Sequence, residues 1–124
     1  YKISTDYFLE NSDAKRVPDK QFDAIVSETS LGKVLRKKPT DTEAKKMILE
    51  FERSIVPVLR RLGKVKKKNA KIVMTFPFIG NFSVDVKKVA RESGLRIYLR
   101  EGIKFPIREF REDQFISREI VVFA

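Results

Sequence analysis

FDAIVSETSLGKVLRKKPTDTEA, residues 22–44, changes character twice along its length and decides the fold of the chain. It begins as an apolar, β-branched run, which predicts a fully buried strand over residues 22–27 because no polar face remains. An acid, two hydroxyls and a glycine follow in residues 28–32, and a basic segment then leads toward a helix. A strand, a polar loop and a helix in this order are typical of an α/β fold.

The clearest element in the sequence is the helix that follows this loop. Thr40 and Glu43 form a capping box, and Asp41 also favours a helix N-terminus. Apolar residues then recur at helical spacing and predict one buried stripe, namely Ala44, Met47, Ile48, Phe51, Ile55, Val58, Leu59 and Leu62. We expect Pro57 to bend or restart this helix and Gly63 to end it.

The second half of the chain predicts another strand and a shorter helix. AKIVMTFP, residues 70–77, has the composition of a second buried strand, which Pro77 should end. Ser83 is the expected N-cap of a short helix, and Gly94 should end that helix. Its inward-facing residues are predicted to be Val86, Val89 and Ala90.

Closing strands complete the predicted order of elements. LRIYLR, residues 95–100, predicts a third strand, and FISREIVVF, residues 115–123, predicts a last strand that pairs with its predecessor as an antiparallel hairpin. A brief strand is also expected at residues 7–9. We therefore predict a single α/β domain with a mostly parallel sheet, right-handed crossovers and an antiparallel closing hairpin.

Composition narrows the classes of function. The 124 residues contain no Cys and no His, which excludes a disulfide framework, a thiolate metal site and a histidine-based catalytic triad. The net charge of +10 favours a polyanionic partner, nucleic acid above all, although a Lys/Glu-rich surface is the alternative explanation. No apolar run has the length of a membrane-spanning helix and residue 1 begins no signal-type segment, so a cytoplasmic location without a membrane partner is the default expectation.

The polar loop after the first strand is the predicted site. Ligands of parallel sheets bind outside the carboxyl ends of the strands, where Glu28 stands shortly before the flexible Gly32. A carboxylate at this place accepts hydrogen bonds from an exocyclic amine of a base. Cations behind the loop form a basic rim for the flanking phosphates, namely Lys33, Arg36, Lys37 and Lys38. The alternative is a strand end followed by a solvated basic loop.

The order of elements and the motif DAIVSETSLGKVLRKKPT resemble the C-terminal half of a Rossmann-like S-adenosylmethionine-dependent methyltransferase. The similar branch contains the tRNA guanine amino-methyltransferases and predicted DNA-modification methylases, which are often joined to a THUMP domain. That group has a strand ending in an acid or amide, then typically Pro-Pro-Tyr-Gly or Pro-Tyr-Leu-Gly, and later a Lys/Arg-rich KPT sequence before a helix. The corresponding residues here are Glu28, Thr29, Ser30, Leu31 and Gly32. FREDQFISREIVVF resembles the closing hairpin.

The resemblance implies a three-layer Rossmann-like sheet, S-adenosylmethionine as cofactor and a nucleic acid, foremost tRNA, as substrate. NSDA resembles the motif whose acid, here Asp13, contacts the adenine moiety, with Ala14 beside it. An exocyclic amine of a base would attack the cofactor's methyl group, Glu28 would orient that amine, and Ser30 would supply a second contact. No metal takes part in this chemistry.

Two features depart from the family's pattern. Thr29 and Ser30 replace the proline and the aromatic residue that stacks on the flipped base. No segment matches the glycine-rich loop that follows the family's first strand and binds the methionine end of the cofactor. FIGNF has a single glycine, and it lies in the other half of the order of strands and helices. We therefore expect residues 1–124 to be the C-terminal part of a methyltransferase domain, which binds the cofactor weakly without its N-terminal half or another chain. The alternative is a non-catalytic nucleic-acid-binding or scaffolding module that has lost the cofactor-binding half.

Three further groups of residues have simpler explanations than a functional site. GKVKKKNAK, residues 63–71, can contact phosphates, although a solvated helix terminus is the favoured interpretation. Three aromatic residues have the spacing of core packing rather than of a base-stacking platform, namely Phe76, Phe78 and Phe82. Three acids near the C-terminus alternate with arginines, which indicates a surface ion-pair network rather than a metal site, namely Glu109, Glu112 and Asp113.

Overall fold

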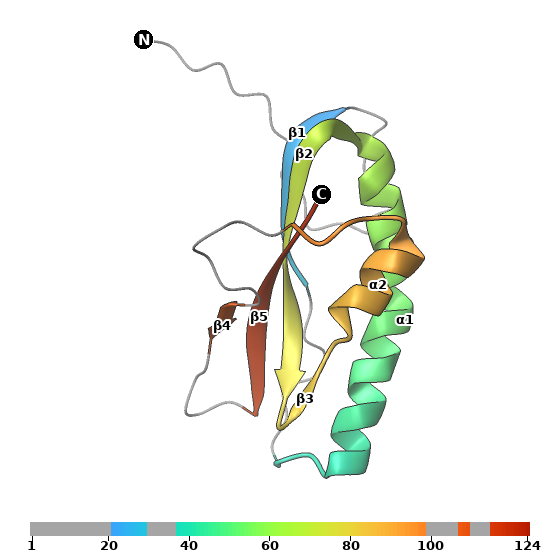
Figure 1. Cartoon of the computed structure of the whole chain (residues 1–124). Coiled ribbons are helices and arrows are strands. Elements are labelled where there is room, and N and C mark those ends of the chain that lie inside the picture. Colours follow the sequence, from blue (N-terminus) through green and yellow to red (C-terminus); the bar gives the residue numbers. More distant parts are fainter. Residues whose placement is uncertain (1–20, 30–36, 99–106, 110–114) are drawn as a thin grey trace.

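The computed structural model describes residues 21–29, 37–98, 107–109 and 115–124 of the chain. In these residues a mixed, open sheet carries two helices on one of its faces (Figure 1), which confirms the expected α/β class. The helices are α1 (Asp41–Val65) and α2 (Val86–Ser93). The strands are β1 (Phe22–Glu28), β2 (Lys66–Ile79), β3 (Phe82–Ser83), β4 (Ile107–Glu109) and β5 (Ile116–Phe123).

The sheet has the strand order β1-β2-β5-β4, and the short β3 pairs with the end of β2. β1 and β2 are parallel, as expected for two strands joined through a helix. β5 is antiparallel to both of its neighbours, β2 and β4. The prediction of a mostly parallel sheet is therefore wrong for the described strands, in which β1–β2 is the one parallel pair. The last strand does pair antiparallel at the closing edge, but its partner there is β4 and not the predicted strand at residues 95–100, of which Ile97 alone bridges to it in the described part.

The prediction that the first strand is fully buried is wrong. β1 lies at the edge of the described sheet, and its Val26 side chain is 79% exposed. Ile25 packs against the core, whereas Val26 projects from the opposite face because successive side chains alternate along a strand. A short apolar run does not reveal by itself whether both faces of a strand are covered.

Helix α1 begins as predicted and ends later than predicted. The Glu43 N–H donates to Thr40 Oγ1 at 3.2 Å, and the Thr40 hydroxyl donates to Glu43 Oε1 at 3.1 Å. The helix is not restarted at Pro57, and it continues beyond Gly63 to Val65. A Cβ atom at Gly63 would lie 3.2 Å from Leu95 Cδ2, so this glycine allows close packing rather than ending the helix.

Strand β2 is longer than the predicted residues 70–77 at both ends. Pro77 does not end strand β2, which continues to Ile79. The registered pairs between β2 and β1 stop at Thr75, and those between β2 and β3 start at Phe78. Pro77 thus falls in a gap on that side of β2, where a missing N–H removes no ladder bond with either strand. Gly80 has φ 59° and allows the tight turn from β2 into β3.

The hydrophobic core lies between the helices and one face of the sheet. Phe76 is completely buried, and its ring lies 5.2 Å from Phe51 of α1 and 5.8 Å from Phe123 of β5, measured between centroids. The predicted helical stripe of α1 is confirmed, with most of its members buried and Met47, Phe51 and Val58 packed against the core from partly exposed positions. Phe76 and Phe82 likewise belong to packing, as their spacing predicted.

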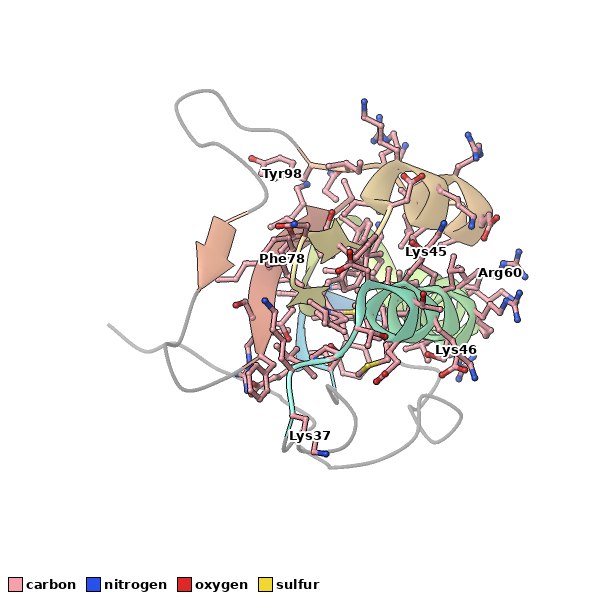
Figure 2. All side chains as sticks on the ribbon, turned by 90° about the horizontal axis from the view of Figure 1, so that it is seen from below. Lys37, Lys45, Lys46, Arg60, Phe78 and Tyr98 are labelled. Carbon is pink, nitrogen blue, oxygen red and sulfur yellow. The ribbon has the colours of Figure 1, made fainter. Side chains whose placement is uncertain are left out.

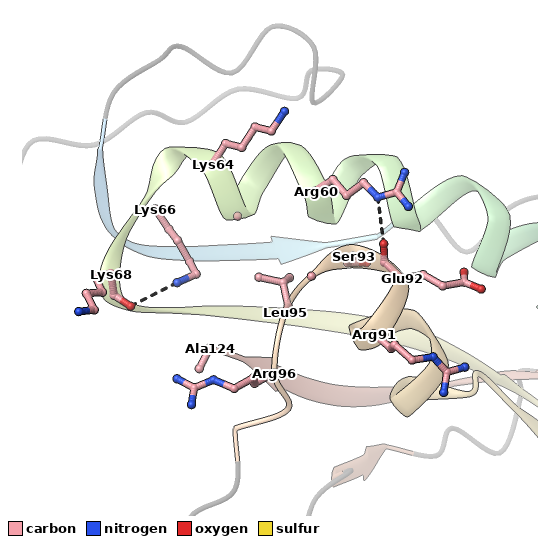
Figure 3. A pocket seen from close by; sticks show the side chains of 12 residues that line it. Arg60, Lys64, Lys66, Lys68, Arg91, Glu92, Ser93, Leu95, Arg96 and Ala124 are labelled. Atoms are coloured by element: carbon pink, nitrogen blue, oxygen red, sulfur yellow. Dashed lines mark hydrogen bonds between the residues drawn. The ribbon is translucent and has the colours of Figure 1, made fainter.

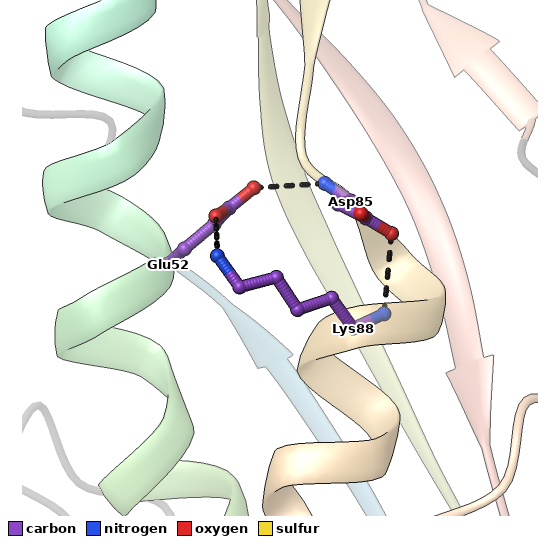
Figure 4. A network of polar contacts seen from close by, with 3 residues as sticks. All are labelled: Glu52, Asp85 and Lys88. Atoms are coloured by element: carbon purple, nitrogen blue, oxygen red, sulfur yellow. Dashed lines mark hydrogen bonds and ion pairs between the residues drawn. The ribbon is translucent and has the colours of Figure 1, made fainter.

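Helix α2 is attached to α1 through a network of polar contacts (Figure 4). Its N-cap is Asp85 and not the predicted Ser83, since the Lys88 N–H donates to Asp85 Oδ1 at 3.1 Å. Glu52 of α1, only 6% exposed, accepts a hydrogen bond from the Asp85 N–H at 2.9 Å and pairs with Lys88 Nζ at 3.3 Å. Gly94 ends α2 with φ 72°, which confirms the predicted stop.

The predicted third strand is wrong in its described part, residues 95–98. Ile97 forms an isolated antiparallel bridge with Phe123, supported by a hydrogen bond from the Tyr98 N–H to the Val122 carbonyl at 2.8 Å. The rest of that predicted strand and the brief strand at residues 7–9 lie outside the described residues. Neither described helix has the combination of length and hydrophobicity that crossing a membrane requires.

Candidate functional site

The polar loop begins at the carboxyl end of the parallel strand pair, as the sequence predicted. Glu28 is the last residue of β1 and lies opposite Thr75, the last β2 residue registered with β1. The next residue, Thr29, is fixed to β2 by two hydrogen bonds. Its N–H donates to Thr75 Oγ1 at 3.2 Å, and its hydroxyl donates to the Thr75 carbonyl oxygen. The start of the loop is thereby held in place by β2.

The carboxylate of Glu28 forms an ion pair with Arg118 of β5. Arg118 Nη1 donates to Glu28 Oε1, whereas Oε2 has no hydrogen-bond partner among the described residues. The pair is only partly screened from water, since the side chains of Glu28 and Arg118 are 59% and 30% exposed. Both side chains lie on the sheet face away from the helices, because Thr75 alternates with the core residues Met74 and Phe76. Within the described ranges, one carboxylate oxygen of Glu28 is therefore available to a ligand.

Two of the four predicted rim cations can be located. Lys37 and Lys38 are exposed and directly precede α1, and Figure 2 shows Lys37 pointing away from the packed side chains. The other predicted site residues lie outside the described residues, namely Asp13, Ala14, Ser30, Lys33 and Arg36.

A small cavity lies between the start of α1 and the turn after β2. Its volume is about 230 Å³, and Lys38, Phe78 and Phe115 are among the residues that line it. Sites for small molecules usually measure about 300–1,000 Å³, so this cavity does not by itself accommodate a nucleoside cofactor. Within the described ranges, no group of three or more acids, histidines or cysteines could hold a metal ion. Of the acids considered above, Glu112 and Asp113 lie outside these ranges.

A larger cavity of about 580 Å³ lies at the opposite edge of the parallel strands (Figure 3). Lys66, at the start of β2, pairs with Phe22, the first residue of β1, which places this cavity away from Glu28. We call it the basic pocket, after the cations that line it, namely Arg60, Lys64, Lys66, Lys68, Arg91 and Arg96. Glu92 is the one acidic side chain in its described lining.

The sequence interpretation missed the basic pocket. It treated residues 63–71 as a solvated helix terminus, whereas from Lys66 onward they belong to β2. Arg91 and Arg96 reach the same pocket from the end of α2 and the segment after it, and no local sequence pattern links them to Lys68. Comparison with protein-family models and with curated proteins gives no match for this sequence.

Proposed function

We propose that the chain is the C-terminal part of a Rossmann-like S-adenosylmethionine-dependent methyltransferase domain acting on an exocyclic amine of a nucleic-acid base, foremost in tRNA. The observation that carries the proposal is the position of Glu28 at the carboxyl end of a parallel strand pair, the edge where α/β enzymes bind their ligands. The antiparallel β4–β5 pair that closes the mixed sheet supports the same fold, because the resemblance expects a closing hairpin there.

In this proposal Glu28 binds and orients the target amine. Its Oε1 is held by Arg118, and its Oε2 is free among the described residues to accept a hydrogen bond from an amine N–H. This hydrogen bond aligns the nitrogen lone pair with the methyl donor and stabilises the positive charge that develops on nitrogen. The described residues form no cradle for the cofactor, so the chemistry assigned to them is orientation of the acceptor amine alone.

The experiment is single-turnover methyl transfer from a labelled donor to bulk tRNA, with DNA in parallel, using the whole protein that carries this chain. Glu28→Gln keeps the size and one acceptor oxygen but removes the charge, so the rate should fall on the order of a hundredfold. Glu50→Gln is the matched control, since Glu50 is an exposed acid of α1 far along the chain from the site. Absence of transfer by the parent protein, or an unchanged rate for Glu28→Gln, would refute the proposal.

A non-catalytic nucleic-acid-binding module is the second candidate, and the basic pocket is the observation that favours it. In its described lining, the pocket gathers six cations against one acidic side chain, at an edge where the proposal places no chemistry. Such a module would bind tRNA or DNA with a steep salt dependence because neutralised phosphates release counterions. It would transfer no methyl group in the assay above, so the same preparation distinguishes the two candidates.

A further inference from the structure

We infer that the basic pocket is a docking site for consecutive phosphates of a polynucleotide backbone. Four of its cations have side chains with no hydrogen bond or ion pair in the described part of the chain, namely Lys64, Lys68, Arg91 and Arg96. Cations elsewhere in the described residues do find acids, as Lys67 does with Asp23 and Lys88 with Glu52. Within the described ranges, the pocket thus concentrates positive charge that no acid compensates by an ion pair.

The remaining cations have partial roles in the protein itself. The Arg60 Nε–H donates to the Glu92 carbonyl at 2.9 Å, and Lys66 Nζ approaches the carbonyls of Lys67 and Lys68 at 3.4 and 3.5 Å (Figure 3). Cations near helix C-termini also offset the helix dipole. That role does not explain Lys68, which belongs to β2 and not to a helix. The charge in the pocket therefore exceeds what the fold requires.

The lining of the pocket selects phosphate over a base or a small apolar ligand. No aromatic side chain lines its described part, and Leu95 is the largest apolar residue there. A base would find no stacking surface, whereas phosphate oxygens would find donors that arrive from α1, β2 and the end of α2. The binding should accordingly be independent of base sequence and strongly dependent on salt.

The position of the pocket implies a ligand longer than a nucleotide. Lys37 and Lys38 precede α1, and the pocket lies at the other end of this helix. From Asp41 to Lys64 the helix extends about 35 Å at about 1.5 Å per residue. That length corresponds to roughly ten base-pair steps of about 3.4 Å. The inference rests on the proposed function in one respect, namely that the docked polymer is the molecule that carries the target base.

The first experiment removes pocket charges without removing internal contacts. In Lys64→Gln/Lys68→Gln/Arg91→Gln, three cations of the pocket become neutral, and the matched control is Lys45→Gln/Arg53→Gln/Lys87→Gln at exposed positions outside it. Binding of a duplex of about 20 base pairs should weaken at least tenfold more in the pocket variant than in the control, and the slope of log Kd against log salt should fall by about two to three. Equal loss in both variants would overturn the inference. Lys68→Gln/Arg96→Gln repeats the test should the triple variant melt early.

Two further arms identify the ligand. A duplex of about 6 base pairs still offers consecutive phosphates to the pocket but cannot also reach Lys38, so the parent protein should bind it more weakly than the longer duplex, and the pocket variant should lose most of the binding that remains. Inorganic phosphate and a mononucleotide should compete only at millimolar concentration. Micromolar competition by either would instead make the pocket a site for a small phosphate compound and overturn the polymer assignment. The binding probes report on the pocket and the methyl-transfer assay reports on Glu28, so failure of docking and failure of catalysis are distinguishable.

Discussion

Arg118 of β5 donates a hydrogen bond to Glu28 of β1, although β2 lies between the two strands and the residues are 90 positions apart in the sequence. The pair crosses the face of β2 that the helices leave uncovered. In the part of the chain that the structure describes, Glu28 is thereby a strand-end carboxylate with one oxygen held by Arg118 and the other without a hydrogen-bond partner. The contact connects the polar loop to the last strand of the sheet and makes Arg118 a positioning residue for the proposed site.

Replacing Arg118 should affect methyl transfer more than stability. Arg118→Gln should lower the free energy of unfolding by less than about 1 kcal/mol, because ion pairs between exposed side chains contribute little. The single-turnover rate should fall about five- to tenfold, since the Glu28 carboxylate loses the contact that fixes its orientation. Arg118→Lys keeps a cation at this position and should recover part of the rate. If Arg118→Gln reacts at the parental rate, the ion pair has no part in positioning.

The attachment of Thr29 to Thr75 should be measurable as stability. Thr75→Val keeps the shape of the side chain but leaves the partly buried Thr29 N–H without its acceptor, which should cost about 1 kcal/mol. Thr42→Val is the matched control, because Thr42 is an exposed threonine in the first turn of α1. Urea unfolding of both variants gives the comparison. A loss in the control as large as in Thr75→Val would mean that the hydrogen bond contributes nothing.

Removing the carboxylate of Glu52 should destabilise the fold measurably. Glu52→Ala leaves Lys88 and the Asp85 N–H without an acceptor at a position that is 6% exposed. The expected loss is about 2–3 kcal/mol, below the range for a fully buried pair because the Lys88 side chain is 39% exposed. Glu52→Gln can still accept from the Asp85 N–H and should lose about half as much. Denaturant unfolding measures both, and equal losses would show that the hydrogen bond from the Asp85 N–H contributes nothing beyond the ion pair with Lys88.

The parts of the fold that local sequence encodes could be predicted. The capping box at Thr40 and the glycine stop at Gly94 depend on residues within one turn of the chain, and both appear in the structure. The exposure of Val26 could not be predicted, because it depends on β1 lying at the edge of the sheet. The end of α1 was misplaced for a related reason, since Gly63 meets Leu95 through tertiary packing.

In the candidate site, too, local sequence determines some features and the tertiary arrangement determines the others. The carboxylate at the end of β1 follows from a strand boundary that composition reveals, so Glu28 could be singled out from the sequence. Its partner Arg118 could not be, because strand order decides which residues face each other across β2. The basic pocket escaped notice for the same reason, since Lys68 and Arg91 meet only after α2 has packed beside α1.

The end of α2 offers a test of backbone geometry that is free of side-chain contacts. Gly94 has φ 72° and ψ 23°, and a Cβ atom built there would meet nothing within 4 Å. Gly94→Ala should therefore lose about 1–2 kcal/mol through left-handed backbone strain alone. Gly94→Asn should lose clearly less, because asparagine tolerates this conformation better than alanine does. Urea unfolding ranks the three proteins. If residue 94 had a negative φ, Gly94→Ala would instead stabilise the protein, because alanine restricts the conformational freedom of the unfolded chain. A more stable Gly94→Ala variant would therefore contradict the left-handed end of α2.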